Sequence, residues 1–134
     1  MSLLLLDTTF LIDAERGVAQ LDDLIGDADD VAIAAITLAE LTVGVRLATA
    51  RRRPRRQLYV DAIAESIPVL PYDQSVARCH TDLLAAARRS GRPRGAHDLI
   101  IAATAVEAGR TIVSSDRRAF DGLPGVTAVD HRPR

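Results

Sequence analysis

Short apolar runs alternate with longer segments of helical periodicity along this chain, and the alternation limits the possible folds more than any other feature. The runs that predict strands are residues 3–6, 31–36, 67–70, 111–114 and 126–129. The segments that predict helices are residues 9–16, 18–25, 38–48, 54–66, 74–90 and 96–108. Strands that alternate with helices predict an α/β fold, a parallel sheet with helices on both faces.

Glycine and proline positions refine this prediction. A glycine follows four of the predicted helices, where glycine commonly ends a helix: Gly17, Gly26, Gly91 and Gly109. Pro68 lies in the strand predicted at 67–70 and has no backbone N–H to donate, so we expect that strand at an edge of the sheet. The 134 residues, 48% of them hydrophobic, fit one domain with a single core over residues 1–134.

Residue types that are missing exclude several kinds of site. All 17 basic residues are arginine, which excludes a P-loop, Schiff-base chemistry, and phosphatase or receiver sites that pair aspartate with lysine. Cys79 is the one cysteine, so neither a disulfide framework nor a cysteine-rich zinc site is expected. No run approaches the ~20 apolar residues of a membrane helix, and residues 3–6 are too few for a signal peptide. We expect a soluble, cytoplasmic protein with no membrane partner.

The charge of the chain argues against a protein that binds nucleic acid through an overall positive charge, because the net charge is −1 and the pI about 6.3. Arginines are nevertheless concentrated in two clusters, Arg51–Arg56 and Arg88–Arg94. Either cluster fits a solvated loop end or a contact surface for phosphates. Aromatic residues make up only 3% of the chain, which argues against single-strand binding by base stacking.

Four acids are predicted at one edge of the sheet. Asp7 and Asp116 follow strands, Glu40 lies early in the helix after the second strand, and Asp98 begins helix 96–108. Each alone could serve its helix end, Glu40 through a capping box with Thr37. Together they would repel one another at the carboxyl edge of a parallel sheet unless a cation lay among them. Oxygen ligands select a hard ion, Mg²⁺ or Mn²⁺.

Four stretches carry a resemblance to a known family: LLLLDTTFLI, AELTVG, HDLIIAATA and SSDRRAF, in this order. Together they resemble the PIN-domain nucleases, above all the VapC-type toxins of bacterial toxin–antitoxin modules, over almost the whole chain. The resemblance implies a three-layer α/β/α sandwich with a parallel sheet of about five strands. It implies that the metal-binding acids are Asp7, Glu40, Asp98 and Asp116, with Thr9 and Ser114 as supporting hydroxyls.

The resemblance also implies an activity and partners. The expected activity is Mg²⁺-dependent (or Mn²⁺-dependent) endoribonuclease cleavage that leaves a 5′-phosphate and a 3′-hydroxyl. The expected partners are RNA, a VapB-type antitoxin and a second copy of the chain. Residues of the helix around Glu40 offer apolar surface for such a dimer: Leu38, Val43, Val45 and Leu47.

Three alternatives remain open. A metal-free ribonuclease would need a histidine pair drawn from His80, His97 and His131. A catalytically silent PIN-like module would bind RNA or a partner without cutting. A deoxyribonuclease would use the same acids on another sugar. We expect Asp121, a possible fifth acid, to be a surface residue.

Overall fold

The computed structural model describes residues 2–17 and 28–130. Their strands form one parallel sheet in the order β3-β2-β1-β4-β5. The strands are β1 (Leu3–Leu6), β2 (Asp30–Ala34), β3 (Val69–Leu70), β4 (Thr111–Ser114) and β5 (Ala128–Asp130). The helices are α1 (Thr8–Glu15), α3 (Ala35–Leu47), α4 (Arg53–Ser66), α5 (Gln74–Ser90) and α6 (Ala96–Ala108), with a 3-10 turn, η1 (Arg117–Ala119).

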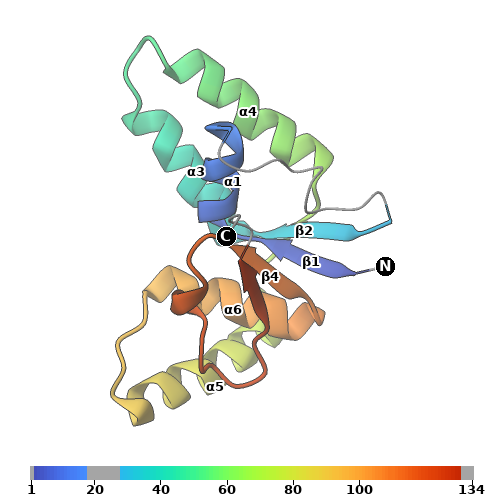
Figure 1. The fold of residues 1–134 in the computed structure, drawn as a ribbon, viewed down its shortest axis with the longest axis vertical. Coiled ribbons are helices and arrows are strands. Elements are labelled where there is room, and N and C mark those ends of the chain that lie inside the picture. Colours follow the sequence, from blue (N-terminus) through green and yellow to red (C-terminus); the bar gives the residue numbers. More distant parts are fainter. Residues whose placement is uncertain (1, 18–27, 131–134) are drawn as a thin grey trace.

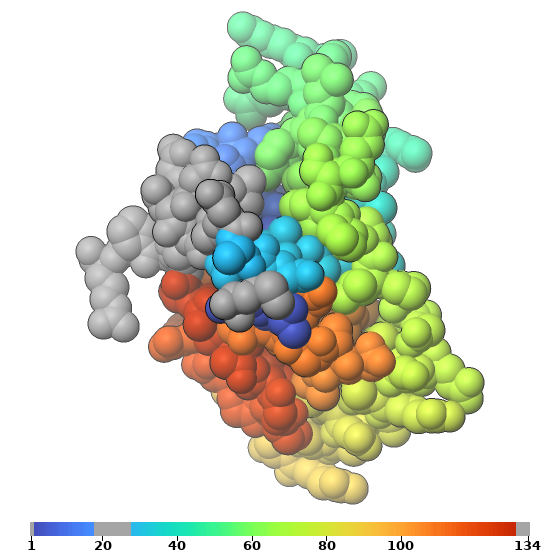
Figure 2. Space-filling view, turned by 90° about the vertical axis from the view of Figure 1, so that its right-hand side faces the viewer, coloured from blue at the N-terminus to red at the C-terminus, as the bar shows by residue number. Residues whose placement is uncertain are grey.

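Two layers of helices enclose the sheet. Helices α1, α3 and α4 lie on one side of it, and α5 and α6 lie on the other (Figure 1). The predicted three-layer α/β/α sandwich is therefore confirmed. Seen from its side, the molecule is long, with the turn between α3 and α4 at one end and α5 at the other (Figure 2).

Strand β1 is central and buried on both faces. Leu4 and Leu6 pack with the core under α1, α3 and α4, while Leu5 packs with the core under α5 and α6. Side chains alternate across a strand, so a continuous leucine run fits a position between two helical layers. The last strand residue, Leu6, pairs with Val113 of β4, which brings the ends of these two strands together.

Most predicted elements are confirmed, and the differences lie at their ends. Helices α5 and α6 match their predicted bounds, and Gly91 and Gly109 end them in the left-handed conformation. Strand β3 is an edge strand, as Pro68 indicated. The strand predicted at 31–36 ends at Ala34, because Ala35 and Ile36 already belong to α3. The strand predicted at 126–129 is β5, two residues later.

The helix predicted at 18–25 and Gly26 lie outside the described residues. None of the described helices combines the length and the apolarity that crossing a bilayer requires.

Candidate active site

Asp7 leaves the end of β1 and caps α1. Its Oδ1 accepts a 2.9 Å hydrogen bond from the backbone N–H of Phe10, so the helix-capping role is real. The carboxylate is 3% exposed, however, and hydroxyls also surround it. Thr9 donates to Oδ1 at 2.8 Å, and Ser114 donates to Oδ2 at 2.6 Å. A helix cap needs none of these extra donors, so the site holds the Asp7 carboxylate in one orientation.

Ser114 and Thr9 connect the ends of β1 and β4. Their hydroxyl oxygens lie 3.2 Å apart. The Thr9 oxygen accepts the N–H of Ser115 at 3.1 Å, and the Ser114 oxygen accepts the N–H of Asp116 at 2.9 Å. The network therefore fixes the backbone that leads into Asp116 as well as the carboxylate of Asp7.

Glu40 reaches the same region from α3, but not in the way the sequence suggested. Helix α3 begins at Ala35 with Ala34 as its N-cap and no side-chain cap, so Glu40 lies in the second turn. The predicted capping box with Thr37 is wrong, since the Thr37 hydroxyl is buried without a hydrogen-bond partner among the described residues. The Oε1 of Glu40 instead accepts a 2.8 Å hydrogen bond from Thr8, next to Asp7.

Asp98 lies in the first turn of α6, as predicted. Its carboxylate lies close against Gly95, the N-cap residue of the helix. A Cβ on Gly95 would lie 2.6 Å from Oδ2 of Asp98, which is closer than real Cβ contacts allow. The absence of a side chain at residue 95 is therefore what gives the Asp98 carboxylate its present place.

Asp116 follows β4 and precedes η1. It stands in the N-cap position of that turn, but its side chain makes no capping hydrogen bond. The capping explanation offered for Asp116 by its sequence position is therefore not supported. Asp121 is exposed and pairs with Arg117 at 3.8 Å, which agrees with the predicted surface role.

The electrostatics of Asp98 show that the other three acids act on it. Burial is the main cause that raises the pKa of Asp98 above its ordinary value. The charges of Asp7, Glu40 and Asp116 raise it further, and His97 opposes them. Among the described residues, however, no three acidic, histidine or cysteine side chains are placed to hold one ion as they stand. The acids thus share one electrostatic field without forming a closed set of ligands.

Two of the three histidines can be placed. Nδ1 of His97 lies 3.3 Å from Oε2 of Glu40, at the rim of the acid group, with 56% of its side chain exposed. His80 pairs with Tyr72 on α5, with Nδ1 2.8 Å from the phenol oxygen. His131 lies outside the described residues. His97 and His80 therefore have different partners in different places, and the described part of the chain holds no histidine pair of the metal-free type.

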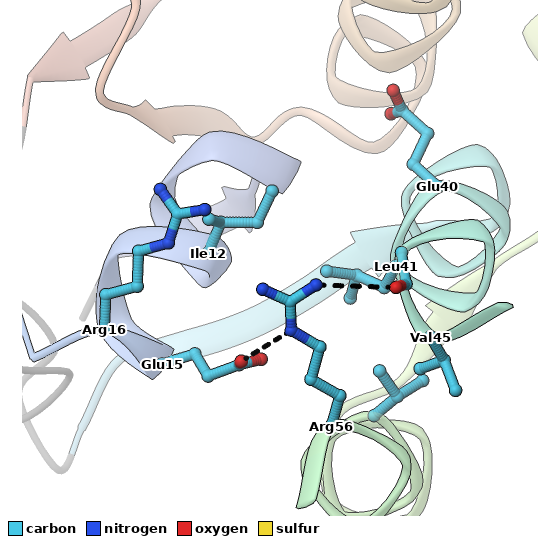
Figure 3. Close-up of a pocket in the computed structure, with 9 residues that line it drawn as sticks. Ile12, Glu15, Arg16, Glu40, Leu41, Val45 and Arg56 are labelled. Atoms are coloured by element: carbon cyan, nitrogen blue, oxygen red, sulfur yellow. Dashed lines mark hydrogen bonds and ion pairs between the residues drawn. The ribbon is translucent and has the colours of Figure 1, made fainter. Parts of the chain in front are cut away.

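A small pocket opens beside Glu40, between α1, α3 and α4 (Figure 3). Apolar side chains such as Leu41 and Val60 form its floor. Arg56 projects across it, 3.4 Å from Glu15 and within 3.5 Å of the carbonyl oxygen of Gly44. The pocket is therefore lined by Glu40 of the acid group and by the oppositely charged side chains of Arg56 and Glu15.

Sequence reasoning missed two residues of this site. Thr8 holds Glu40, and its signal was the pair of hydroxyl residues directly after Asp7. Gly95 makes room for Asp98, and its signal was a glycine three residues before an acid in a first helical turn.

Comparisons with known proteins identify the family of the chain. The family model described as PIN domain matches residues 4–125. The chain is 36% identical over 126 residues to ribonuclease VapC5 of Mycobacterium tuberculosis, covering 93% of this chain and 90% of the relative. It is 32% identical over 130 residues to toxin FitB of Neisseria gonorrhoeae, covering 88% of this chain and 91% of the relative.

The solved structures agree. The crystal structure of VapBC-5 from Mycobacterium tuberculosis, a member of the VapBC family of toxin–antitoxin systems, superposes with a TM-score of 0.80 at 32% identity. It covers 97% of this chain and 99% of the chain compared. PIN-domain nucleases generally depend on a divalent metal ion. The match over both sequence and fold shows that this chain belongs to the PIN-domain family.

Proposed function

We propose that this chain is the toxin of a type II toxin–antitoxin pair, an endoribonuclease that cleaves RNA with a divalent metal held by Asp7, Glu40, Asp98 and Asp116. Its named relatives are ribonucleases and toxins, and the structures it resembles are toxin–antitoxin complexes. The observation that carries the proposal is the proximity of the four acids: Thr8, next to Asp7, holds Glu40, and the pKa of Asp98 is raised first by burial and then by the charges of Asp7, Glu40 and Asp116.

The donor set fits a hard divalent ion. The candidate ligands are carboxylate oxygens, which suit Mg²⁺ or Mn²⁺ better than zinc. A cation among them would replace mutual repulsion with attraction, which explains how a folded chain tolerates the four acids together. Because the described acids do not form a closed ligand set, we expect the side chains of Asp98 and Asp116 to rotate toward Asp7 and Glu40 when the ion binds.

Each residue then has a task that its contacts define. Ser114 and Thr9 hold the Asp7 carboxylate in a fixed orientation, which prepares it as a ligand. Thr8 holds Glu40, and His97 stands beside the same carboxylate, where Glu40 can accept a proton and His97 can relay it. When bound, the metal would activate water for attack on a phosphodiester and offset the charge that develops there.

The RNA substrate needs contacts for its phosphates, and the turn between α3 and α4 offers them. Arg51, Arg52 and Arg55 are exposed there, close to the N-terminus of α4. Arginines at the positive end of a helix dipole lower its stability, so a structural role does not explain them. We assign them to the RNA backbone, which they would hold without reading bases.

Antitoxin binding and dimer formation complete the proposal. A VapB-type antitoxin would inhibit the nuclease in the cytoplasm, where RNA is the target. A second copy of the chain would cover exposed apolar residues of α3 and α4: Val43, Leu47 and Leu58, which are 53%, 81% and 71% exposed. Of the other two dimer candidates, Val45 is buried in the monomer core and Leu38 is partly buried.

The test is RNA cleavage by the purified chain with Mg²⁺ or Mn²⁺, with a chelator, and with the variants Asp98→Asn and Asp121→Asn. We expect discrete fragments that require the metal and Asp98 but not the exposed Asp121. Cleavage that survives the chelator would transfer the chemistry to histidine. Cleavage of DNA alone would change the substrate, and a folded chain that cuts neither would be a silent binding module.

A further inference from the structure

Two arginines of the loop between α5 and α6 bind the main chain of the turn that contains η1. Arg92 donates to the carbonyl oxygen of Arg118 at 2.8 Å and to that of Asp121 at 3.2 Å. Arg94 donates to the carbonyl oxygen of Ala119 at 3.0 Å and also to that of Asp121. Two guanidinium groups thus bind three carbonyl oxygens within four residues of chain. We call this pair of arginines the carbonyl clamp.

The clamp divides the second arginine cluster of the sequence into two parts. Arg88 and Arg89, at the end of α5, are exposed, and their side chains donate no hydrogen bond within the described residues. Arg94 is partly buried, and its Nε lies in the interior without a partner. A guanidinium whose forked end is committed to the protein's own carbonyls is poorly available to a phosphate. Phosphate binding therefore does not explain Arg92 and Arg94.

Two glycines permit the close contacts of this region. Gly122 has φ +81°, and a Cβ there would lie 3.4 Å from Nη2 of Arg94. Gly95, directly after the clamp, leaves the space that the Asp98 carboxylate occupies. A single stretch, Arg92-Pro93-Arg94-Gly95, therefore contacts the turn after Asp116 and also makes room for Asp98.

The clamp connects two elements that are otherwise far apart along the chain. Arg94 stands four residues before Asp98, and the carbonyl of Arg118 stands two residues after Asp116. Movement of the η1 turn would change the separation of these two acids, and a metal site tolerates only small changes in ligand position. Ser114 fixes the backbone before Asp116, while the clamp fixes the backbone after it.

We propose that Arg92 and Arg94 are positioning residues that hold the Asp116 turn against the start of α6 and so set the separation of Asp98 and Asp116 for metal binding. This inference rests on the proposed function, because it assumes that both acids bind the ion. In this proposal Arg92 and Arg94 hold the η1 turn of the protein itself and do not contact RNA phosphates.

The test compares Arg94→Met and Arg92→Met with Arg89→Met, which removes the same charge from the same cluster without touching the clamp. Mn²⁺ binding is measured by calorimetry, and Tm is measured without metal. We expect both clamp variants to bind Mn²⁺ about 10- to 100-fold more weakly, as when a group that orients a ligand is lost. Raising Mn²⁺ should restore most of their RNA cleavage, while Arg89→Met binds the ion like the original chain.

Other outcomes would separate the explanations. Clamp variants with a lower Tm but unchanged Mn²⁺ affinity would make the clamp a purely structural feature and overturn the proposal. Unchanged Mn²⁺ affinity with weaker RNA binding would make the arginines phosphate contacts, which also overturns it. If Arg94→Met does not fold, the more exposed Arg92→Met decides between the same outcomes. An original chain that binds no Mn²⁺ and cuts no RNA would instead refute the proposed function.

Discussion

The hydroxyl of Ser114 donates a 2.6 Å hydrogen bond to Oδ2 of Asp7, from the end of β4 to the end of the neighbouring β1. The same hydroxyl oxygen accepts the N–H of Asp116. The Ser114 side chain therefore holds the carboxylate of Asp7 and also the backbone of Asp116. Because the Asp7 carboxylate is buried, the loss of this hydroxyl leaves it without a donor that solvent can easily replace.

Ser114→Ala should weaken metal binding by about 10- to 100-fold, because the Asp7 carboxylate loses the donor that orients it. The free energy of unfolding should also fall, by about 1–3 kcal/mol, because the buried Asp7 carboxylate loses a hydrogen-bond donor. Calorimetric titration with Mn²⁺ measures the first effect, and urea denaturation measures the second. Ser115→Ala is the matched control, since the structure records no side-chain hydrogen bond for this neighbour. Equal metal affinities in the two variants would refute the role assigned to Ser114.

Asp98→Asn should raise the Tm of the metal-free protein near neutral pH. The folded state raises the pKa of Asp98 above 3.8, so the folded protein loses stability as the pH rises through the folded pKa and the carboxyl ionises. The asparagine variant has no such loss, and its advantage should disappear in acid, where Asp98 is protonated. Saturating Mg²⁺ should reverse the order, because the ion stabilises the original chain alone. Thermal unfolding over a pH series, with and without Mg²⁺, checks both statements. A variant that is less stable than the original at every pH would contradict them.

Replacing Arg51, Arg52 and Arg55 by glutamine should make RNA binding less sensitive to salt. Each lost phosphate contact lowers the slope of log affinity against log salt by about 0.7 for a single strand, so three contacts lower it by about 2. The slope is measured with the Asp98→Asn background, which prevents cleavage. The control is the triple replacement of exposed arginines on α5: Arg78, Arg88 and Arg89. A slope that falls equally in both triples would show only a general charge effect.

Tyr59→Phe should alter stability at alkaline pH. Tyr59 donates a 2.6 Å hydrogen bond from α4 to the carbonyl of Leu11 on α1. Burial first, and the charge of Glu15 second, raise its pKa from 10.0 to about 12. A raised pKa in the folded state means that the protein loses stability as the pH rises from 10 to about 12. The chain has no lysine to titrate there, so this loss is unusually visible.

The phenylalanine variant should be about 0.5–1.5 kcal/mol less stable at neutral pH, where the hydrogen bond is missing, and should lack the alkaline loss due to Tyr59. Denaturation with urea at a series of pH values measures both. Tyr72→Phe, in the loop that precedes α5, serves as the control. An alkaline loss that persists unchanged in Tyr59→Phe would show that another group causes it.

The sequence predicted the fold well because burial imposes a pattern on it. Leu4, Leu5 and Leu6 are buried and must be apolar, since β1 has a helical layer on each face, whereas Leu3 at the start of the strand is exposed. Strand and helix ends were predicted less well. Ala35 and Ile36 are as apolar as β2, and no side chain caps α3, so nothing in the sequence marked its start. That error led directly to the wrong capping box for Glu40.

The sequence could predict those residues of the candidate site that lie at the carboxyl edge of the parallel sheet. Asp7, Asp98 and Asp116 follow from which edge of a parallel sheet their elements reach. The supporting contacts of Thr8 and Arg94 were not predictable in this way, because their partners lie on other elements. A run of arginines looks the same in sequence whether it faces solvent or binds carbonyl oxygens. The three-dimensional contacts alone separate Arg94 from Arg89.

The position of β1 at the centre of the sheet also has a consequence for synthesis. The Asp7–Ser114 hydrogen bond joins residues 107 positions apart, and β1 cannot pair with β4 before β4 exists. On the ribosome the N-terminal strand therefore emerges long before its partner and waits for it. Asp98 and Asp116 also appear long after Asp7. A growing chain thus stays without its complete acid group until residue 116 has been made, which delays any RNA cleavage until that point of synthesis has passed.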